Sequence, residues 1–134
     1  MKICRRETFN AAHRLFVKDW TEEKNRAVFG KCSNPNYHGH NYAIETWLEG
    51  PVDPETGYVY DLGLFKKLIH DVIIDRFDHR NLNLDCVEFE GINPTAENIA
   101  KVCYDVLLPH LPENLKLTIR LYETDKNWVE YNGI

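Results

Sequence analysis

Histidine and cysteine residues gather near the start of the chain at spacings suited to binding a metal ion. The run from Cys32 to His40 holds two histidines, His38 and His40, two residues apart, and His13 lies upstream. Side chains of a β-strand alternate between its two faces, so His38 and His40 share one face of an extended chain. Imidazole and thiolate groups are common zinc ligands. The pattern therefore predicts a zinc site, which Cys32 either completes as a fourth ligand or flanks as a reactive thiol.

The strands that must position these histidines are indicated by the hydrophobic pattern. Three segments alternate apolar and polar residues, as strands do: residues 2–15, 37–49 and 115–123. A fourth strand, residues 128–131, is predicted because it follows a hairpin turn signal. In the second segment His38 and His40 share the parity of the apolar residues. If the first two strands pair as an antiparallel hairpin, His13 lies beside the start of the second strand. Three imidazoles with an open fourth position would form a catalytic type of zinc site.

Two helices are predicted between the second and third strands. Apolar residues recur at helical spacing from Asp61, a plausible N-cap, to about Phe77. A second helix opens at Pro94-Thr95, with Thr95 as its cap, and ends at Pro109. The remaining long connections are expected to be irregular loops: residues 16–36 and 78–93.

The order β-β-α-α-β-β predicts an α+β fold with a four-stranded antiparallel sheet and two helices on one face. The 134 residues fit a single domain, 1–134. A net charge of −5 without a basic block argues against a nucleic-acid partner. No apolar run approaches the roughly 20 residues that span a bilayer, and no signal peptide is evident, so we expect no membrane partner and a cytoplasmic location. The exposed edges of such a sheet favour a homo-oligomer.

Two acidic positions and one further imidazole admit both a structural and a functional interpretation. Asp78-His79 could form the orienting half of a thiol–imidazole–carboxylate relay, but a histidine at a helix end also complements the helix dipole, and composition alone favours that second reading. Glu123, at the end of the third strand, is either a surface charge or a bidentate acceptor for a guanidine-like ring edge. Two other histidines are expected to be structural or solvated: His70 and His110.

Five motifs follow one another along nearly the whole chain: Phe9–Leu15, Phe29–Tyr42, Asp78–Asn83, Pro94–Asn98 and Tyr122–Asp125. Together they resemble the 6-pyruvoyl-tetrahydropterin synthase family, which includes the bacterial 6-carboxytetrahydropterin synthases. The resemblance implies a T-fold (tunnelling fold). It also implies trimers whose sheets join into a barrel, commonly paired as hexamers, with active sites between subunits.

The resemblance implies a role for each candidate residue. It implies three zinc ligands: His13, His38 and His40. It makes Cys32 the catalytic thiol rather than a ligand, with Asp78 and His79 of a neighbouring subunit as its partners. It implies a pterin-binding group: Glu123 as the ring anchor, with Thr95 and Glu97 nearby. Candidate cations for phosphate groups are Arg14, Arg26 and Lys31, and Mg²⁺ is the ion expected if the triphosphate needs one.

The implied activity is that of a zinc-dependent lyase acting on 7,8-dihydroneopterin triphosphate. The five residues between Cys32 and His38 resemble the animal enzymes that make 6-pyruvoyl-tetrahydropterin for tetrahydrobiopterin biosynthesis. The alternative product is 6-carboxy-5,6,7,8-tetrahydropterin, a queuosine precursor, formed with release of acetaldehyde and triphosphate. An alternative of another class is a zinc-stabilised binding module without catalysis, in which Cys32 closes the metal site.

Overall fold

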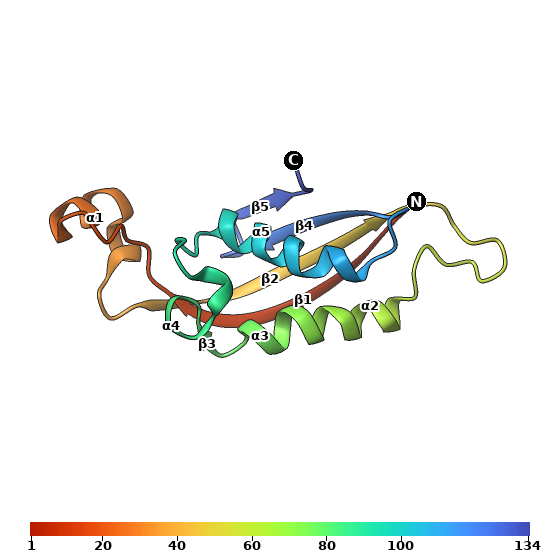
Figure 1. The fold of residues 1–134 in the computed structure, drawn as a ribbon, viewed down its shortest axis with the longest axis horizontal. Helices are drawn as coiled ribbons and strands as arrows, with labels where there is room; N and C mark the ends of the chain where they lie inside the picture. Colours follow the sequence, from red (N-terminus) through yellow and green to blue (C-terminus); the bar gives the residue numbers. More distant parts are fainter.

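Two long strands form the centre of the molecule. The structure, a computed structural model, describes residues 1–134, and its strands β1 (Lys2–His13) and β2 (His38–Glu49) pair antiparallel from end to end. Apolar residues on one face of this hairpin are buried, as the alternating pattern predicts. The hairpin is the long curved ribbon that runs through Figure 1.

The other strands extend the hairpin into a five-stranded sheet with the order β3-β1-β2-β4-β5. Strands β4 (Lys116–Tyr122) and β5 (Trp128–Tyr131) add antiparallel neighbours beside β2. Strand β3 (Arg80–Asn81) pairs parallel to β1 at its other side. The α+β T-fold is confirmed, but the sheet is mixed and has five strands rather than four. A strand of two residues is too short to show an alternating pattern, which is why it was not predicted.

The two predicted helices cover the same face of the sheet (Figure 1). The first is α2 (Leu62–Ile69), continued by a π-helical turn, His70–Ile74, and by α3 (Asp75–Phe77). The second is α5 (Ala96–Leu107), which ends in a 3₁₀ turn, Leu108–His110. Both predicted N-caps are confirmed, because the Asp61 carboxylate accepts two backbone N–H groups and the Thr95 hydroxyl accepts one.

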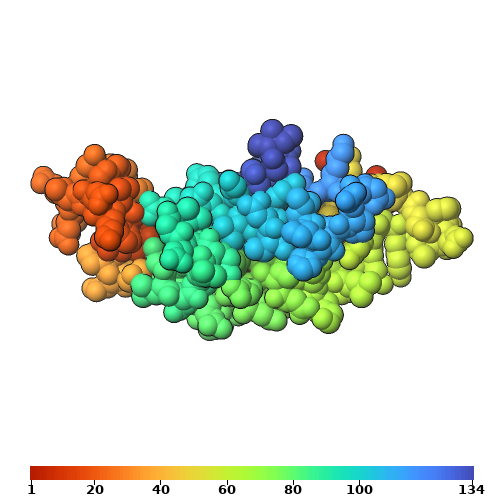
Figure 2. All heavy atoms as spheres, in the orientation of Figure 1, coloured from red at the N-terminus to blue at the C-terminus, as the bar shows by residue number.

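The two connections predicted to be irregular contain short helices. Residues 16–36 hold α1 (Glu22–Phe29) and a 3₁₀ turn (Gly30–Ser33), and together with their flanks they form a lobe at one end of the molecule (Figure 2). Residues 78–93 hold β3, α4 (Leu82–Asp85) and another 3₁₀ turn, Val87–Phe89. Helix α1 has no apolar stripe, since Asn25 is its one buried residue, so periodicity could not reveal it. None of the helices is long and apolar enough to cross a membrane.

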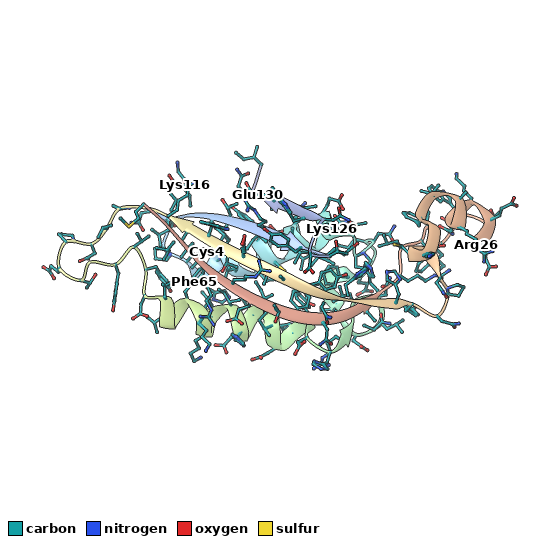
Figure 3. All side chains as sticks on the ribbon, turned by 180° about the vertical axis from the view of Figure 1, so that it is seen from behind. Cys4, Arg26, Phe65, Lys116, Lys126 and Glu130 are labelled. Atoms are coloured by element: carbon teal, nitrogen blue, oxygen red, sulfur yellow. The ribbon has the colours of Figure 1, made fainter.

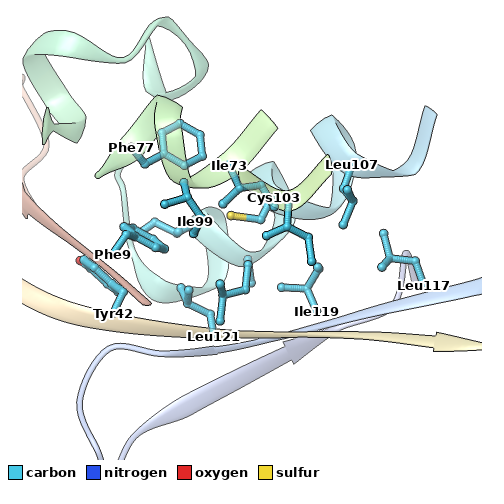
Figure 4. Close-up of a cluster of buried hydrophobic side chains, with 14 of the residues drawn as sticks. Phe9, Tyr42, Ile73, Phe77, Ile99, Cys103, Leu107, Leu117, Ile119 and Leu121 are labelled. Carbon is cyan, nitrogen blue, oxygen red and sulfur yellow. The ribbon is translucent and has the colours of Figure 1, made fainter. Parts of the chain in front are cut away.

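The core lies between the sheet and the two long helices (Figure 4). Phe9 and Tyr42 stack across β1 and β2 with ring centroids 5.1 Å apart. Ile99 and Cys103 of α5 face them from the helix layer and are fully buried, so Cys103 is a core residue. The face that carries Tyr42 also carries the histidines, so the core fixes the side of the sheet on which they lie.

The N-cap of α2 gives a direct test of how the helix layer is held. Replacing Asp61 with alanine removes the acceptor for the N–H groups of Gly63 and Leu64. We expect a loss of about 1 kcal/mol in the free energy of unfolding, measured by urea titration. Asp105→Ala, at an exposed position within α5, is the matched control and should change the free energy by less than about 0.5 kcal/mol. Equal losses in the two variants would contradict a specific capping role.

Candidate functional site

Three imidazoles meet where the β1–β2 hairpin ends. His13 closes β1, His38 opens β2, and the two are cross-strand partners. The Nε2 atom of His38 lies 3.0 Å from Nε2 of His13 and 3.1 Å from Nε2 of His40. One nitrogen from each ring falls within 4.8 Å of the other two. The strands therefore bring the three predicted ligands together on one face, next to Tyr42.

The backbone around His13 sets the state of its ring. Its Nδ1 atom lies 2.8 Å from the carbonyl oxygen of Pro94, just before the N-cap of α5. A carbonyl only accepts hydrogen bonds, so Nδ1 carries the proton and Nε2 presents its lone pair to the other two rings. His13 is fully buried, and burial lowers the pKa of its imidazole to about 4. The ring is therefore neutral near pH 7, as a metal ligand must be.

The arrangement fits a zinc ion in its donor set and in its spacing. Two nitrogens bound at about 2.0–2.1 Å to a tetrahedral Zn²⁺ lie about 3.3 Å apart, close to the two short distances between these rings. Three nitrogens that point at one another cannot all be satisfied by hydrogen bonds among themselves. The cluster consists of the three imidazoles and contains no thiol. It can hold a metal ion and leave a coordination position for another molecule.

Cys32 lies in the 3₁₀ turn Gly30–Ser33, close enough to Glu123 to feel its charge, and is partly exposed. Burial raises the pKa of its thiol, and the nearby Glu123 carboxylate raises it further. Glu123 follows β4, and its Oε1 atom lies 3.9 Å from Nε2 of His40. The fold thus gathers the thiol, the acidic group and the imidazoles in one place.

Asp78 and His79 form an ordered pair at another edge of the sheet. The Oδ2 atom of Asp78 lies 2.9 Å from Nδ1 of His79, while Oδ1 accepts the N–H group of Asn10. His79 takes a left-handed backbone conformation with φ of 60°, and its N–H group donates to the carbonyl of Asn10. Its side chain remains 76% exposed. The pair is therefore held rigidly against β1 with the imidazole directed to solvent.

The remaining predicted residues have contacts that also serve the fold. The Thr95 hydroxyl accepts the N–H group of Asn98 as a helix cap, and Glu97 is exposed in the first turn of α5. Arg14 donates through Nε to the carbonyl of Ser33, so this cation is already engaged. Two of the candidate cations are exposed on the lobe: Lys31 and Arg26, the latter labelled in Figure 3.

Sequence reasoning missed the carbonyl of Pro94. Every residue has a backbone carbonyl, so the sequence does not single this one out, and its role is seen only from its contact with His13. His70, expected to be structural or solvated, lies 3.1 Å from the Glu7 carboxylate between the sheet and the helix layer.

Comparisons with known proteins agree with the motifs. The family model described as 6-pyruvoyl tetrahydropterin synthase matches residues 2–134. The human 6-pyruvoyl tetrahydrobiopterin synthase is 41% identical over 132 residues, which cover 98% of this chain and 91% of that protein. The 6-carboxy-5,6,7,8-tetrahydropterin synthase of Rickettsia conorii is 30% identical over 148 residues, covering 97% and 99%. The structure of the Caenorhabditis elegans 6-pyruvoyl tetrahydropterin synthase superposes with a TM-score of 0.89 at 38% identity, covering 100% and 96%.

Metal content separates the imidazole cluster from the thiol beside it. Alanine at His13, His38 or His40 removes a donor from the cluster, so we expect zinc to fall from stoichiometric to near zero by elemental analysis. Cys32→Ala should keep its zinc, because the thiol is not part of the cluster. His110→Ala, at an exposed histidine elsewhere, is the matched control. Loss of zinc from the Cys32 variant would show that the thiol is a ligand.

Proposed function

Because the chain belongs to the 6-pyruvoyl tetrahydropterin synthase family, we propose that it is a zinc-dependent lyase. Its substrate is 7,8-dihydroneopterin triphosphate, and its products are 6-pyruvoyl-tetrahydropterin and triphosphate. The observation that carries this proposal is the cluster of three imidazoles beside a thiol that is not one of its members. This arrangement suits chemistry at an open metal position better than a closed structural site. It therefore disfavours a zinc-stabilised binding module without catalysis.

The choice of product rests on similarity and spacing. The human 6-pyruvoyl enzyme is 41% identical to this chain, and the Rickettsia 6-carboxy enzyme is 30% identical. The five-residue gap between Cys32 and His38 favours the same product. The alternative, 6-carboxy-5,6,7,8-tetrahydropterin synthase activity, starts from the same substrate and releases acetaldehyde as well as triphosphate.

Each polar group of the site has a part in the proposed reaction. A zinc ion held by the three imidazoles would supply Lewis acidity to the side-chain hydroxyls of the substrate. Cys32 removes a proton from the substrate side chain as a thiolate, and the His79 imidazole, held by Asp78, relays it. The Glu123 carboxylate accepts two hydrogen bonds from the guanidine-like edge of the pterin ring, with Thr95 and Glu97 nearby. Protons are redistributed while triphosphate leaves, and no external oxidant is needed.

We also propose that Asp78 and His79 act on the thiol of a neighbouring subunit in a trimer or a dimer of trimers. Their position at the β3 edge, with the His79 side chain 76% exposed, supports this. Free sheet edges support the assembly, because β3 covers β1 at only Ala11 and Ala12 and β5 has no strand on its outer side.

Product identification is the central test of the proposed activity. Purified protein incubated with 7,8-dihydroneopterin triphosphate should release triphosphate and form the 6-pyruvoyl product, followed by liquid chromatography and mass spectrometry. Appearance of acetaldehyde would establish the 6-carboxy alternative instead. Absence of turnover by zinc-loaded, correctly assembled protein would contradict both.

The thiol is tested by Cys32→Ala. Loss of the general base should lower kcat by about 10²–10⁴-fold while the zinc content stays unchanged. Cys4→Ala is the matched control and should retain kcat, because Cys4 lies near the start of β1 and the histidine cluster lies at the other end of that strand. Turnover in the Cys32 variant equal to that of the control would remove the thiol from the reaction.

The shared site is tested by mixing inactive subunits. Cys32→Ala and His79→Ala chains are each expected to be inactive alone. Co-assembled from denaturant, they should regain activity, because some interfaces then combine an intact thiol with an intact imidazole. Mixed assemblies that form but stay inactive would place the relay within one chain.

A further inference from the structure

The segment that follows β1 is held by side-chain amides where the sheet has ended. The Oδ1 atom of Asn83 accepts the N–H group of Arg14 at 2.8 Å, and its Nδ2 atom donates to the carbonyl of Arg14 at 2.9 Å. Two residues on, the Oδ1 atom of Asn93 accepts the N–H group of Phe16 at 3.1 Å. The two amides occupy the place of a neighbouring strand along one side of the segment.

The other side of the same segment holds the loop that carries the thiol. The N–H group of Leu15 donates to the carbonyl of Cys32 at 2.8 Å. The guanidinium of Arg14 donates through Nε to the carbonyl of Ser33 at 2.9 Å. In an extended chain successive N–H groups point to opposite sides, so bonds at Arg14 and Phe16 leave Leu15 directed the other way. The amides on one side thus determine what the segment offers to Cys32 on the other.

We propose that Asn83 and Asn93 are positioning residues for Cys32. Their amides hold the backbone of residues 14–16, and this segment in turn fixes the backbone at Cys32 and Ser33. This inference rests on the proposed function in taking Cys32 as the reacting thiol. The amides touch neither the thiol nor the imidazoles in the hydrogen bonds they make, so they act through Arg14 and Phe16.

Asn83 also joins this support to the Asp78–His79 pair. The segment that contains both is bonded along β1, because His79 donates to Asn10 and Arg80 and Asn81 pair with Ala11 and Ala12. Asn83 continues the same series of bonds to Arg14. A single stretch of chain therefore holds its own Cys32 loop and presents His79. In the proposed assembly, it would serve two active sites at once.

The two asparagines use different atoms, which provides a sharp test. Asn83 needs both an acceptor and a donor, whereas the Asn93 side chain is used here as an acceptor. Asn93→Asp keeps its acceptor and should behave like the wild type, while Asn83→Asp loses its donor and should be impaired. Alanine should impair both positions. Asn114→Ala, at an exposed asparagine remote from the site, is the control.

The first measurement is steady-state kinetics with 7,8-dihydroneopterin triphosphate. Misplacing the thiol should lower kcat by about 10–100-fold in Asn83→Ala, Asn83→Asp and Asn93→Ala, with KM little changed. A merely structural role would lower the amount of folded protein and leave kcat per folded, zinc-loaded subunit unchanged.

The second measurement does not depend on turnover. The rate at which iodoacetamide alkylates Cys32, followed by peptide mass spectrometry, should rise several-fold in the three impaired variants, because the loop is no longer fixed. Asn93→Asp and the control should match the wild type. If the proposed reaction is absent but these rates change, the positioning role stands and the proposed function fails.

The proposal is overturned if Asn83→Asp matches the control in both kcat and alkylation rate. Should the Asn83 variants fail to fold, Arg14→Met removes the bond to the Ser33 carbonyl and the stacking of the guanidinium on the Phe16 ring, and it leaves the amide contacts with the backbone intact. It should then raise the alkylation rate in the same direction. An unchanged rate in that variant and in Asn93→Ala would equally overturn the proposal.

Discussion

The register of the β1–β2 hairpin is the constraint on which the site depends. Pairing of His13 with His38 places both rings on the helix-covered face, and His40 follows two residues later on the same face. A slip of one residue would turn the β2 histidines to the opposite face. The register is maintained by the core, where Phe9 opposes Tyr42 and the two rings stack. Burial of apolar side chains therefore holds three polar side chains in a metal-binding arrangement.

The end of β1 also collects the other parts of the site. Asn10 is hydrogen-bonded to Asp78 and His79, and His13 is hydrogen-bonded to the carbonyl of Pro94. The segment after His13 is hydrogen-bonded to the loop that carries Cys32. These partners come from separate stretches of the chain, and each docks through hydrogen bonds to the same few residues. A strand within a sheet positions such groups more precisely than a loop does, and β1 pairs with β2 along its whole length and with β3 at Ala11 and Ala12. The relative positions of the parts thus follow from one strand.

The sequence predicted the features that arise from periodicity and left out those that arise from single contacts. Strand parity put His38 and His40 on the buried face, and this needed only the alternation of β2. Helix α1 was not predicted because its buried residue is Asn25 and it has no apolar stripe. Strand β3 was not predicted because two residues are too few to show a period. The Pro94 carbonyl that contacts His13 could not be predicted, because every residue type has a backbone carbonyl. For Cys32, spacing left two interpretations open, and the motif resemblance favoured the catalytic thiol, which stays a prediction.

The surroundings of the thiol are consistent with the proposed active site between subunits. Burial and the Glu123 carboxylate raise the pKa of Cys32, which favours the protonated thiol, a poorer base than the thiolate. The imidazole of His79 is oriented by Asp78 but directed to solvent at the β3 edge. The Cys32 thiol would need a group that accepts its proton, and the exposed His79 imidazole would need a group that supplies one. In the proposed assembly the two groups would meet at a subunit boundary, where the exposed imidazole could accept the proton of the thiol.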